Sequence, residues 1–86
     1  MSITIKLFSS LRVVLGESEF EFVLTERDGT ATVAEVKSAL SQRGAIWREA
    51  LNQPNLVHAL NHKVVYTDAV VAAGDELAFF PPMTGG

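Results

Sequence analysis

No cysteine occurs among the 86 residues of the chain, which excludes disulfide bonds, thiolate metal sites and a cysteine nucleophile. This composition is compatible with a reducing cytosol. Basic residues are also sparse, because lysine and arginine number 7 against 10 acidic residues, and they form no cluster. A nucleic-acid partner is therefore a poor expectation, since phosphate backbones are bound by concentrated positive charge.

The chain also lacks an apolar run long enough to cross a bilayer, and its first residues show no pattern of a secretory signal. We therefore expect a cytoplasmic protein without membrane contact. A metal site is not expected either, because carboxylates do not cluster, and His58 and His62 fall on a predicted strand and the turn after it. The hydrophobic content of 48% is enough for the core of one domain over residues 1–86.

Two segments near the start alternate between apolar and polar residues, which is the pattern of half-buried strands. They cover residues 2–8 and 19–24, and a short helical turn ending at Gly16 is expected between them. A turn-rich connection follows at residues 25–30. The side chains expected to face the core are Ile3, Ile5, Leu7, Phe20, Phe22 and Leu24.

The principal helix is predicted over residues 32–44. Thr32 and Glu35 have the spacing of a capping box, in which each side chain satisfies a free amide of the first turn. Arg43 would lie in the last turn, where a positive charge is favourable to the helix dipole. Gly44 would end the helix in the left-handed conformation.

The rest of the chain is predicted as a second, short helix and three strands. The helix covers residues 45–52, two strands cover residues 56–60 and 63–66, and the last strand follows a turn within residues 69–80. Asn61-His62 is expected to form a tight hairpin turn, and Gly74-Asp75 another turn. Trp47 is expected to serve packing rather than ligand stacking. The element order indicates an α+β fold with a mixed sheet packed on one main helix.

Two phenylalanines fall on the polar faces of their strands. Phe8 shares a face with Lys6, and Phe80 shares a face with Glu76. If the first and last strands lie side by side and parallel, the two rings form one exposed apolar patch, which is typical of a protein interface. The alternative is that both rings pack under a loop or against the segment that follows the first strand.

The chain ends in "FFPPMTGG". The two prolines neither continue a helix nor donate to a sheet, so they extend the chain stiffly away from the last strand. Two glycines let the backbone pass where a side chain would clash. We expect a projecting tail that threads a narrow channel of a partner and presents its carboxylate, with a frayed end as the alternative. The tail comprises Pro81, Pro82, Met83, Thr84, Gly85 and Gly86.

The ending "GDELAFFPPMTGG" closely resembles the C-terminal signature of the small subunits of molybdopterin synthase, the MoaD family. The resemblance extends, with less specific motifs, through "IKLFSSLRVVLG", "TVAEVKSAL" and "HALNHKVV". It implies the β-grasp, ubiquitin-like fold, in which the first and last strands are adjacent and parallel. This arrangement favours the shared patch of Phe8 and Phe80.

The resemblance also implies a sulfur carrier of molybdenum cofactor biosynthesis rather than an enzyme acting alone. An E1-like adenylating enzyme would use ATP to activate the carboxylate of Gly86, and a sulfur donor system would convert it to a thiocarboxylate. The tail would then enter the large subunit of molybdopterin synthase, within a heterotetramer, and donate sulfur to cyclic pyranopterin monophosphate. The chain itself would bind no cofactor, and the catalytic side chains would come from the large subunit.

The family pattern further implies which residues contact the partner. Phe8 and Phe80 match its interface aromatics, and Val64 takes the place of an apolar contact residue, where a leucine is expected. Arg12 matches an often basic position that would form a salt bridge to the partner. Met83 replaces the valine common in the family's ending and is close to it in volume.

Other functions stay open. Related carriers that end in Gly-Gly serve thiamine synthesis, tRNA thiolation or protein conjugation, although thiazole carriers tend to be shorter and to lack "FFPP". A non-catalytic ubiquitin-like adaptor would not depend on Gly86 at all. A stand-alone enzyme is least expected, because Glu17, Glu19 and Glu21 are typical of a solvated strand edge.

Overall fold

The computed structural model describes residues 1–24 and 29–82, which contain every helix and strand discussed below. The elements are, in chain order, β1 (Ser2–Leu7), α1 (Ser10–Leu15), β2 (Glu19–Val23), β3 (Thr30–Thr32), α2 (Val33–Ser41), α3 (Ala45–Leu51), β4 (Val57–Leu60), β5 (Lys63–Val65), β6 (Val70–Ala72) and β7 (Glu76–Phe80).

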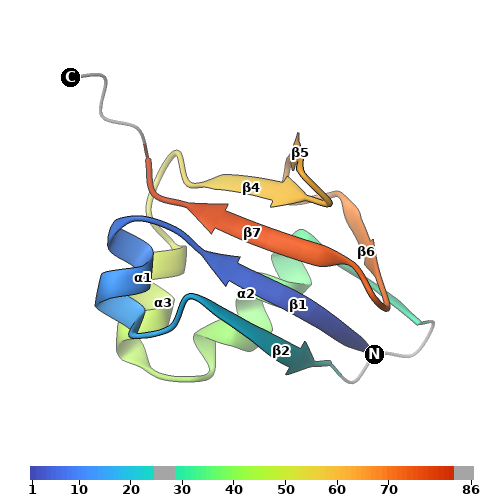
Figure 1. Ribbon diagram of the computed structural model, residues 1–86, viewed down its shortest axis with the longest axis horizontal. Helices are drawn as coiled ribbons and strands as arrows, with labels where there is room; N and C mark the ends of the chain where they lie inside the picture. Colours follow the sequence, from blue (N-terminus) through green and yellow to red (C-terminus); the bar gives the residue numbers. More distant parts are fainter. Residues whose placement is uncertain (25–28, 83–86) are drawn as a thin grey trace.

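Five of the strands form one mixed sheet in the order β2-β1-β7-β4-β5. The central pair, β1 and β7, is parallel, and the other neighbours are antiparallel. The helices lie behind this sheet in Figure 1, so one sheet face is covered and the other is open. The predicted α+β architecture is confirmed, including the parallel first and last strands.

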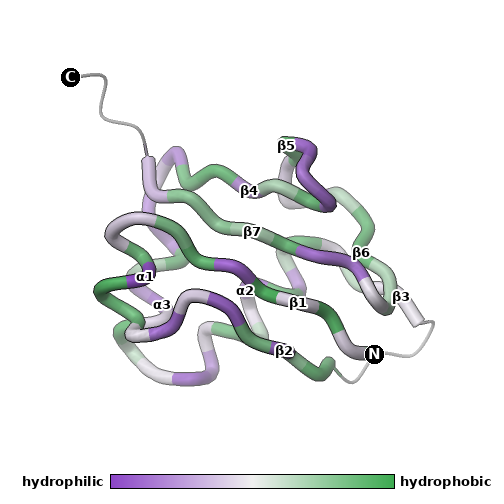
Figure 2. The backbone as a smooth tube through the Cα atoms, viewed as in Figure 1, coloured by the Kyte–Doolittle hydropathy of each residue, from purple (hydrophilic) through white to green (hydrophobic). Residues whose placement is uncertain are grey.

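The core lies between the sheet and the helices. Along β1 every second residue is buried, which follows from the two-residue repeat of a strand, and the same alternation is visible in the colours of Figure 2. Each fully buried aliphatic or aromatic side chain contributes about 1.5–3 kcal/mol. The largest fully buried side chains are Phe79, Ile3, Ile5, Leu7, Leu11, Leu40, Leu51, Leu77, Val33, Val36 and Val71.

The start of α2 agrees with the prediction, and its end does not. The hydroxyl of Thr32 accepts from the Glu35 amide at 3.2 Å, and the Thr32 amide donates to the Glu35 carboxylate at 2.8 Å. The helix ends at Ser41 rather than at residue 44, so Arg43 is not in its last turn. Gly44 instead directly precedes α3, where its φ is 152°.

Arg43 lies beyond the end of α2 because its side chain makes more favourable contacts there. Its guanidinium group lies 4.5 Å from the ring centroid of Phe20 and 4.3 Å from that of Trp47. One of its nitrogens donates to Glu17 at 2.8 Å. Stacking on two aromatic rings together with an ion pair outweighs the few tenths of a kcal/mol that a helix dipole offers an exposed cation. Trp47 is buried, as expected for a packing residue.

Two short strands, β3 and β6, were not predicted from the sequence. Thr30–Thr32 forms β3 and pairs antiparallel with β6 in a separate two-stranded sheet. Three residues are too few to show a repeat of two, and their pairing partner lies far along the chain. The element count is therefore larger than predicted, although the layers are the same.

The predicted hairpin turn places β5 beside β4 and is fastened to β7. Asn61 and His62 have φ values of 50° and 72°, the geometry of a mirror-image two-residue turn. The side-chain oxygen of Asn61 accepts from the Glu76 amide at 2.9 Å, and its nitrogen donates to Asp75 at 3.1 Å. This attachment holds the hairpin against the first residues of β7.

Candidate functional site

Phe8 and Phe80 form a stacked pair at the end of the two central strands. The parallel register places Leu7 opposite Phe79, and the Phe8 amide donates to the Phe79 carbonyl at 3.3 Å. The ring centroids are 4.5 Å apart and the ring planes differ by 7°. Phe8 remains 37% exposed, so the pair forms the apolar patch that residue parity predicted. Its role as an interface stays a prediction.

The patch belongs to a groove of about 280 Å³ on the open face of the sheet. Val64 on β5 lies across the groove and is 69% exposed. Small side chains line the part of the groove between Val64 and the aromatic pair, and larger side chains at these positions would fill it. The lining residues are Lys6, Phe8, Ala59, His62, Val64, Glu76, Ala78 and Phe80.

Charged and polar side chains border the groove and lie close to one another. The ammonium group of Lys6 lies 3.2 Å from one oxygen of Glu76 and 4.0 Å from Glu19. The Nε2 atom of His62 lies 3.6 Å from the other oxygen of Glu76. A partner that covers the groove therefore meets an apolar centre with a paired polar rim, which is the usual composition of a protein interface.

The structure brings three of the four predicted interface residues together, and the fourth lies apart. Phe8, Val64 and Phe80 line the groove, whereas Arg12 is exposed on α1 and does not. The Arg12 amide donates to the Ser9 carbonyl at 3.1 Å, which keeps Arg12 within one helical turn of the aromatic pair. A partner that covers the groove and extends over α1 would contact all four residues.

The predicted tail begins at the aromatic pair. Pro81 and Pro82 follow Phe80 directly, and both are half-buried. Met83, Thr84, Gly85 and Gly86 lie outside the described residues, so their predicted roles stay predictions. The tail and the groove are therefore continuous along the chain, and one partner surface can hold both.

Five lining residues were not among the predicted site residues. Lys6, Glu76 and Ala78 lie on the same strand faces as Phe8 and Phe80. The alternation of side chains along a strand was therefore sufficient to predict these three. The other two, Ala59 and His62, reach the groove only through the pairing of β4 with β7 and through the hairpin turn. No local pattern in the sequence marks them.

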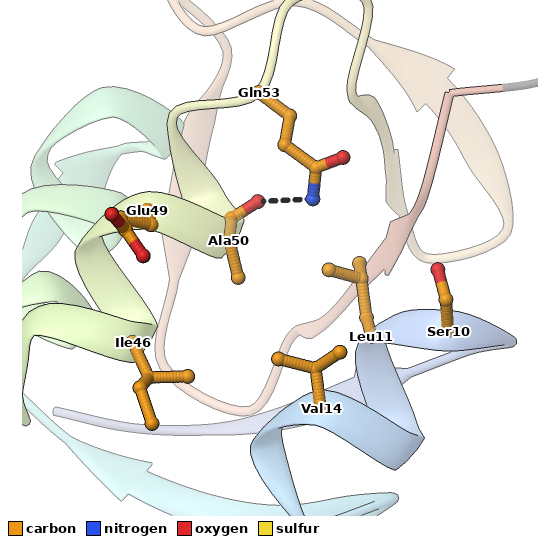
Figure 3. A pocket seen from close by; sticks show the side chains of 7 residues that line it. All are labelled: Ser10, Leu11, Val14, Ile46, Glu49, Ala50 and Gln53. Carbon is orange, nitrogen blue, oxygen red and sulfur yellow. Dashed lines mark hydrogen bonds between the residues drawn. The ribbon is translucent and has the colours of Figure 1, made fainter.

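A second groove of about 280 Å³ lies between α1 and α3 (Figure 3). Its walls carry Leu11, Val14 and Ile46, and the amide nitrogen of Gln53 donates to the Ala50 carbonyl at 3.0 Å. It contains none of the predicted site residues and shares no lining residue with the groove on the sheet. We therefore regard the sheet groove as the candidate site.

His58 is a buried residue of the core rather than an acid or base of the site. Its ring packs edge-on against Phe79, with centroids 5.7 Å apart, and its Nε2 atom has no hydrogen-bond partner among the described residues. Burial lowers the pKa of His58 below its ordinary value of 6.5, and the positive charge of Lys37 adds to this effect. The imidazole is therefore neutral at pH 7.

Within residues 1–24 and 29–82, no three His, Cys, Asp or Glu side chains gather as metal ligands. No helix of this described part is long and apolar enough to cross a membrane.

Known proteins with the same fold share this arrangement of sheet and helices. SAMP1 from Haloferax volcanii matches with a TM-score of 0.79 and 29% identity over the full length of both chains. The complex of subunits 1 and 2 of the molybdopterin-converting factor from Helicobacter pylori 26695 matches with a TM-score of 0.66 and 20% identity, again over the full length of both chains. These structures define the fold as that of the ubiquitin-like β-grasp sulfur carriers.

Sequence comparison identifies the family to which the chain belongs within this class of proteins. The model of the ThiS family matches residues 5–86. The molybdopterin synthase sulfur carrier subunit of Haemophilus influenzae is 35% identical over 79 residues, which cover 92% of this chain and 93% of that protein. The chain therefore belongs to the ThiS family and is a homologue of the molybdopterin synthase sulfur carrier subunits.

Proposed function

We propose that this chain carries sulfur on its C-terminal glycine and delivers it within a molybdopterin synthase. The observation that carries the proposal is the similarity to the sulfur carrier subunit of Haemophilus influenzae over 92% of this chain, together with the final Gly-Gly of the given sequence. The groove supports it, because the aromatic pair lies at the point where the tail leaves the domain. A partner that docks on the groove would therefore also receive the C-terminus.

The chemistry begins at the carboxylate of Gly86, which is a poor acyl electrophile. An E1-like adenylating enzyme transfers AMP from ATP to this carboxylate and releases pyrophosphate. A sulfur donor system then displaces AMP and leaves a C-terminal thiocarboxylate. The tail contributes no acid or base to these steps, so the proton transfers belong to the partners.

The second stage takes place on the large subunit of the synthase. Phe8, Val64 and Phe80 bury their apolar surfaces against it, and Arg12 forms a salt bridge at the edge of the contact. Pro81 and Pro82 direct the tail into the active site, where Gly85 passes a channel too narrow for a side chain. The thiocarboxylate sulfur then forms a bond to cyclic pyranopterin monophosphate, and water cleaves the bond between this sulfur and the acyl carbon of Gly86, which leaves a carboxylate on the chain.

The intact mass of the protein tests the first stage. After incubation with the activating enzyme, ATP and the sulfur donor, we expect a mass increase equal to the exchange of one oxygen for sulfur. Deletion of Gly86 should abolish the increase without changing the fold, because the buried core residues of the described part all precede Phe80 in sequence. A competent activating enzyme that produces no increase would contradict the proposal and favour a non-catalytic adaptor.

Addition of the large subunit and the pterin precursor tests the second stage. We expect the increase in mass to disappear as sulfur enters the precursor. The second candidate function is use of the C-terminus on another acceptor, which the full-length match to SAMP1, a small archaeal modifier protein, favours. A chain that acquires sulfur but does not release it to the precursor would support this second candidate and contradict the first.

A further inference from the structure

A polar pocket of about 410 Å³ lies on the helical side of the molecule, between α2 and α3. It is distinct from the groove on the sheet, with which it shares no lining residue. The amide of Ala34 donates to the Thr67 carbonyl at 3.0 Å, which holds the segment between β5 and β6 against the pocket. The lining residues are Ala34, Lys37, Ser38, Ser41, Gln42, Arg48, Asn52 and Thr67.

The charged residues of this pocket are all of one sign. Lys37 and Arg48 line it, and no carboxylate does, although the chain has more acidic than basic residues. Glu49, the neighbour of Arg48 in sequence, lines the groove between α1 and α3 instead. The pocket is therefore lined by two cations and no carboxylate, in a protein whose formal net charge is -3.

These two cations also lack carboxylate partners among the described residues, unlike Lys6 and Arg43 but like the exposed Arg12 and Lys63. Lys6 pairs with Glu76, and Arg43 pairs with Glu17, whereas neither Lys37 nor Arg48 forms an ion pair within residues 1–24 and 29–82. Burial lowers the pKa of Lys37, so its charge is incompletely solvated. A negative charge bound between the two side chains would offset that cost.

The neutral residues of the pocket add hydrogen-bonding groups around the cations. Gln42 and Asn52 supply side-chain amides, and Ser38 and Thr67 supply hydroxyls. The hydroxyl of Ser41 is already committed, since it donates to the Lys37 carbonyl at 2.8 Å. A guanidinium group can bind two oxygens of a phosphate at once, and an ammonium group adds a point charge.

We propose that this pocket binds an organic phosphate, with Lys37 and Arg48 holding the phosphoryl group. The volume lies in the range of small-molecule sites, about 300–1,000 Å³, and therefore leaves room for more than the phosphate alone. Amides and hydroxyls of the lining are placed to bind the polar part of such a molecule. The proposal does not rest on sulfur transfer, because it uses none of the residues of the tail or the sheet groove.

The test is a titration of the ¹⁵N-labelled chain with adenosine monophosphate and, separately, with inorganic phosphate at constant ionic strength. We expect saturable shifts confined to the amides of the pocket, and adenosine monophosphate should bind at least about tenfold more tightly than inorganic phosphate. Lys37→Gln and Arg48→Gln should each weaken binding about tenfold, because each removes a charge-assisted contact. Lys63→Gln is the matched control, since Lys63 is exposed on β5 and does not line the pocket.

Several results would overturn the proposal. Shifts spread over the whole surface, or equal weakening by Lys63→Gln, would show only a general response to anions. Equal affinity for both probes would show that the pocket selects no organic phosphate. If Lys37→Gln fails to fold, Arg48→Gln decides the question, because Arg48 is exposed and its replacement removes no core contact.

Discussion

Alanine substitutions at Phe79 and Phe80 compare two neighbouring rings on opposite sides of the same strand. Phe79 is fully buried between the sheet and the helices, whereas Phe80 is half-buried and stacks on Phe8 at the open face. The two variants differ by one position in sequence and remove the same atoms. They therefore separate the contribution of a core ring from that of an interface ring.

The expected magnitudes follow from these environments. Phe79→Ala leaves a cavity in the core, and it should lower the free energy of unfolding by about 3–5 kcal/mol. Phe80→Ala removes an aromatic pair worth about 0.5–1.5 kcal/mol and only part of the burial energy of a ring, so we expect a loss of about 1–2 kcal/mol. As a central anchor of an interface, Phe80 should contribute about 2–4 kcal/mol to binding, or roughly 30-fold to several hundred-fold in Kd.

Two assays measure these quantities. Urea unfolding followed by the fluorescence of Trp47 gives the free energy of unfolding, because Trp47 is buried in the folded chain. Calorimetric titration against the purified large subunit gives Kd for each variant that is folded under the conditions used. Phe8→Ala should resemble Phe80→Ala in both assays, since the two rings form one surface.

The reasoning would be refuted by a Phe80→Ala variant that loses as much stability as Phe79→Ala while its affinity for the large subunit is unchanged. That result would assign Phe80 to the core. An unchanged affinity with a small loss of stability would equally exclude the groove as the docking surface. It would not contradict the proposal that Gly86 acquires sulfur.

Three further predictions concern stability. Burial lowers the pKa of His58, so the unfolded chain binds a proton more readily than the folded chain below about pH 6.5. As the pH decreases from about 6.5, the free energy of unfolding should therefore fall until the pH is below the pKa of His58 in the folded state. His58→Leu should flatten this part of the profile below about pH 6.5, and an unchanged slope in urea midpoints would disprove the assignment. Arg43→Ala should cost about 1–2 kcal/mol, and Arg43→Lys should recover less than half of it, because lysine cannot stack as a plane on Phe20 and Trp47; full recovery by lysine would show that charge alone matters. Thr32→Ala should cost about 1 kcal/mol in thermal or urea unfolding by removing the cap of α2, whereas a neutral result would mean that the capping box contributes nothing.

Local features of the fold were predictable because they depend on residues that are neighbours in the chain. The alternation in β1 assigns its buried side chains, since successive residues of a strand point to opposite faces. The turn at Asn61-His62 and the cap at Thr32 likewise follow from short-range geometry. The resemblance in the tail supplied the fold family, and with it the parallel placement of the first and last strands.

Arg43 shows where local reasoning fails. Its place next to a predicted helix end suggested a dipole interaction, yet its actual partners are Phe20 on β2, Trp47 on α3 and Glu17, which precedes β2. The strand β3 was missed for a related reason, since its partner β6 is distant in sequence. In both cases the decisive energy comes from surfaces that meet only after the elements have packed.

The candidate site combines the two kinds of information. The face on which Phe8 and Phe80 lie is a property of strand alternation, and the sequence alone was sufficient to assign it. The distance between the rings, and the groove that they form with Val64 and His62, depend on the pairing of β1 with β7 and of β4 with β5. Such pairings are selected by burial summed over the whole chain, and for that reason no short segment of the sequence contains them.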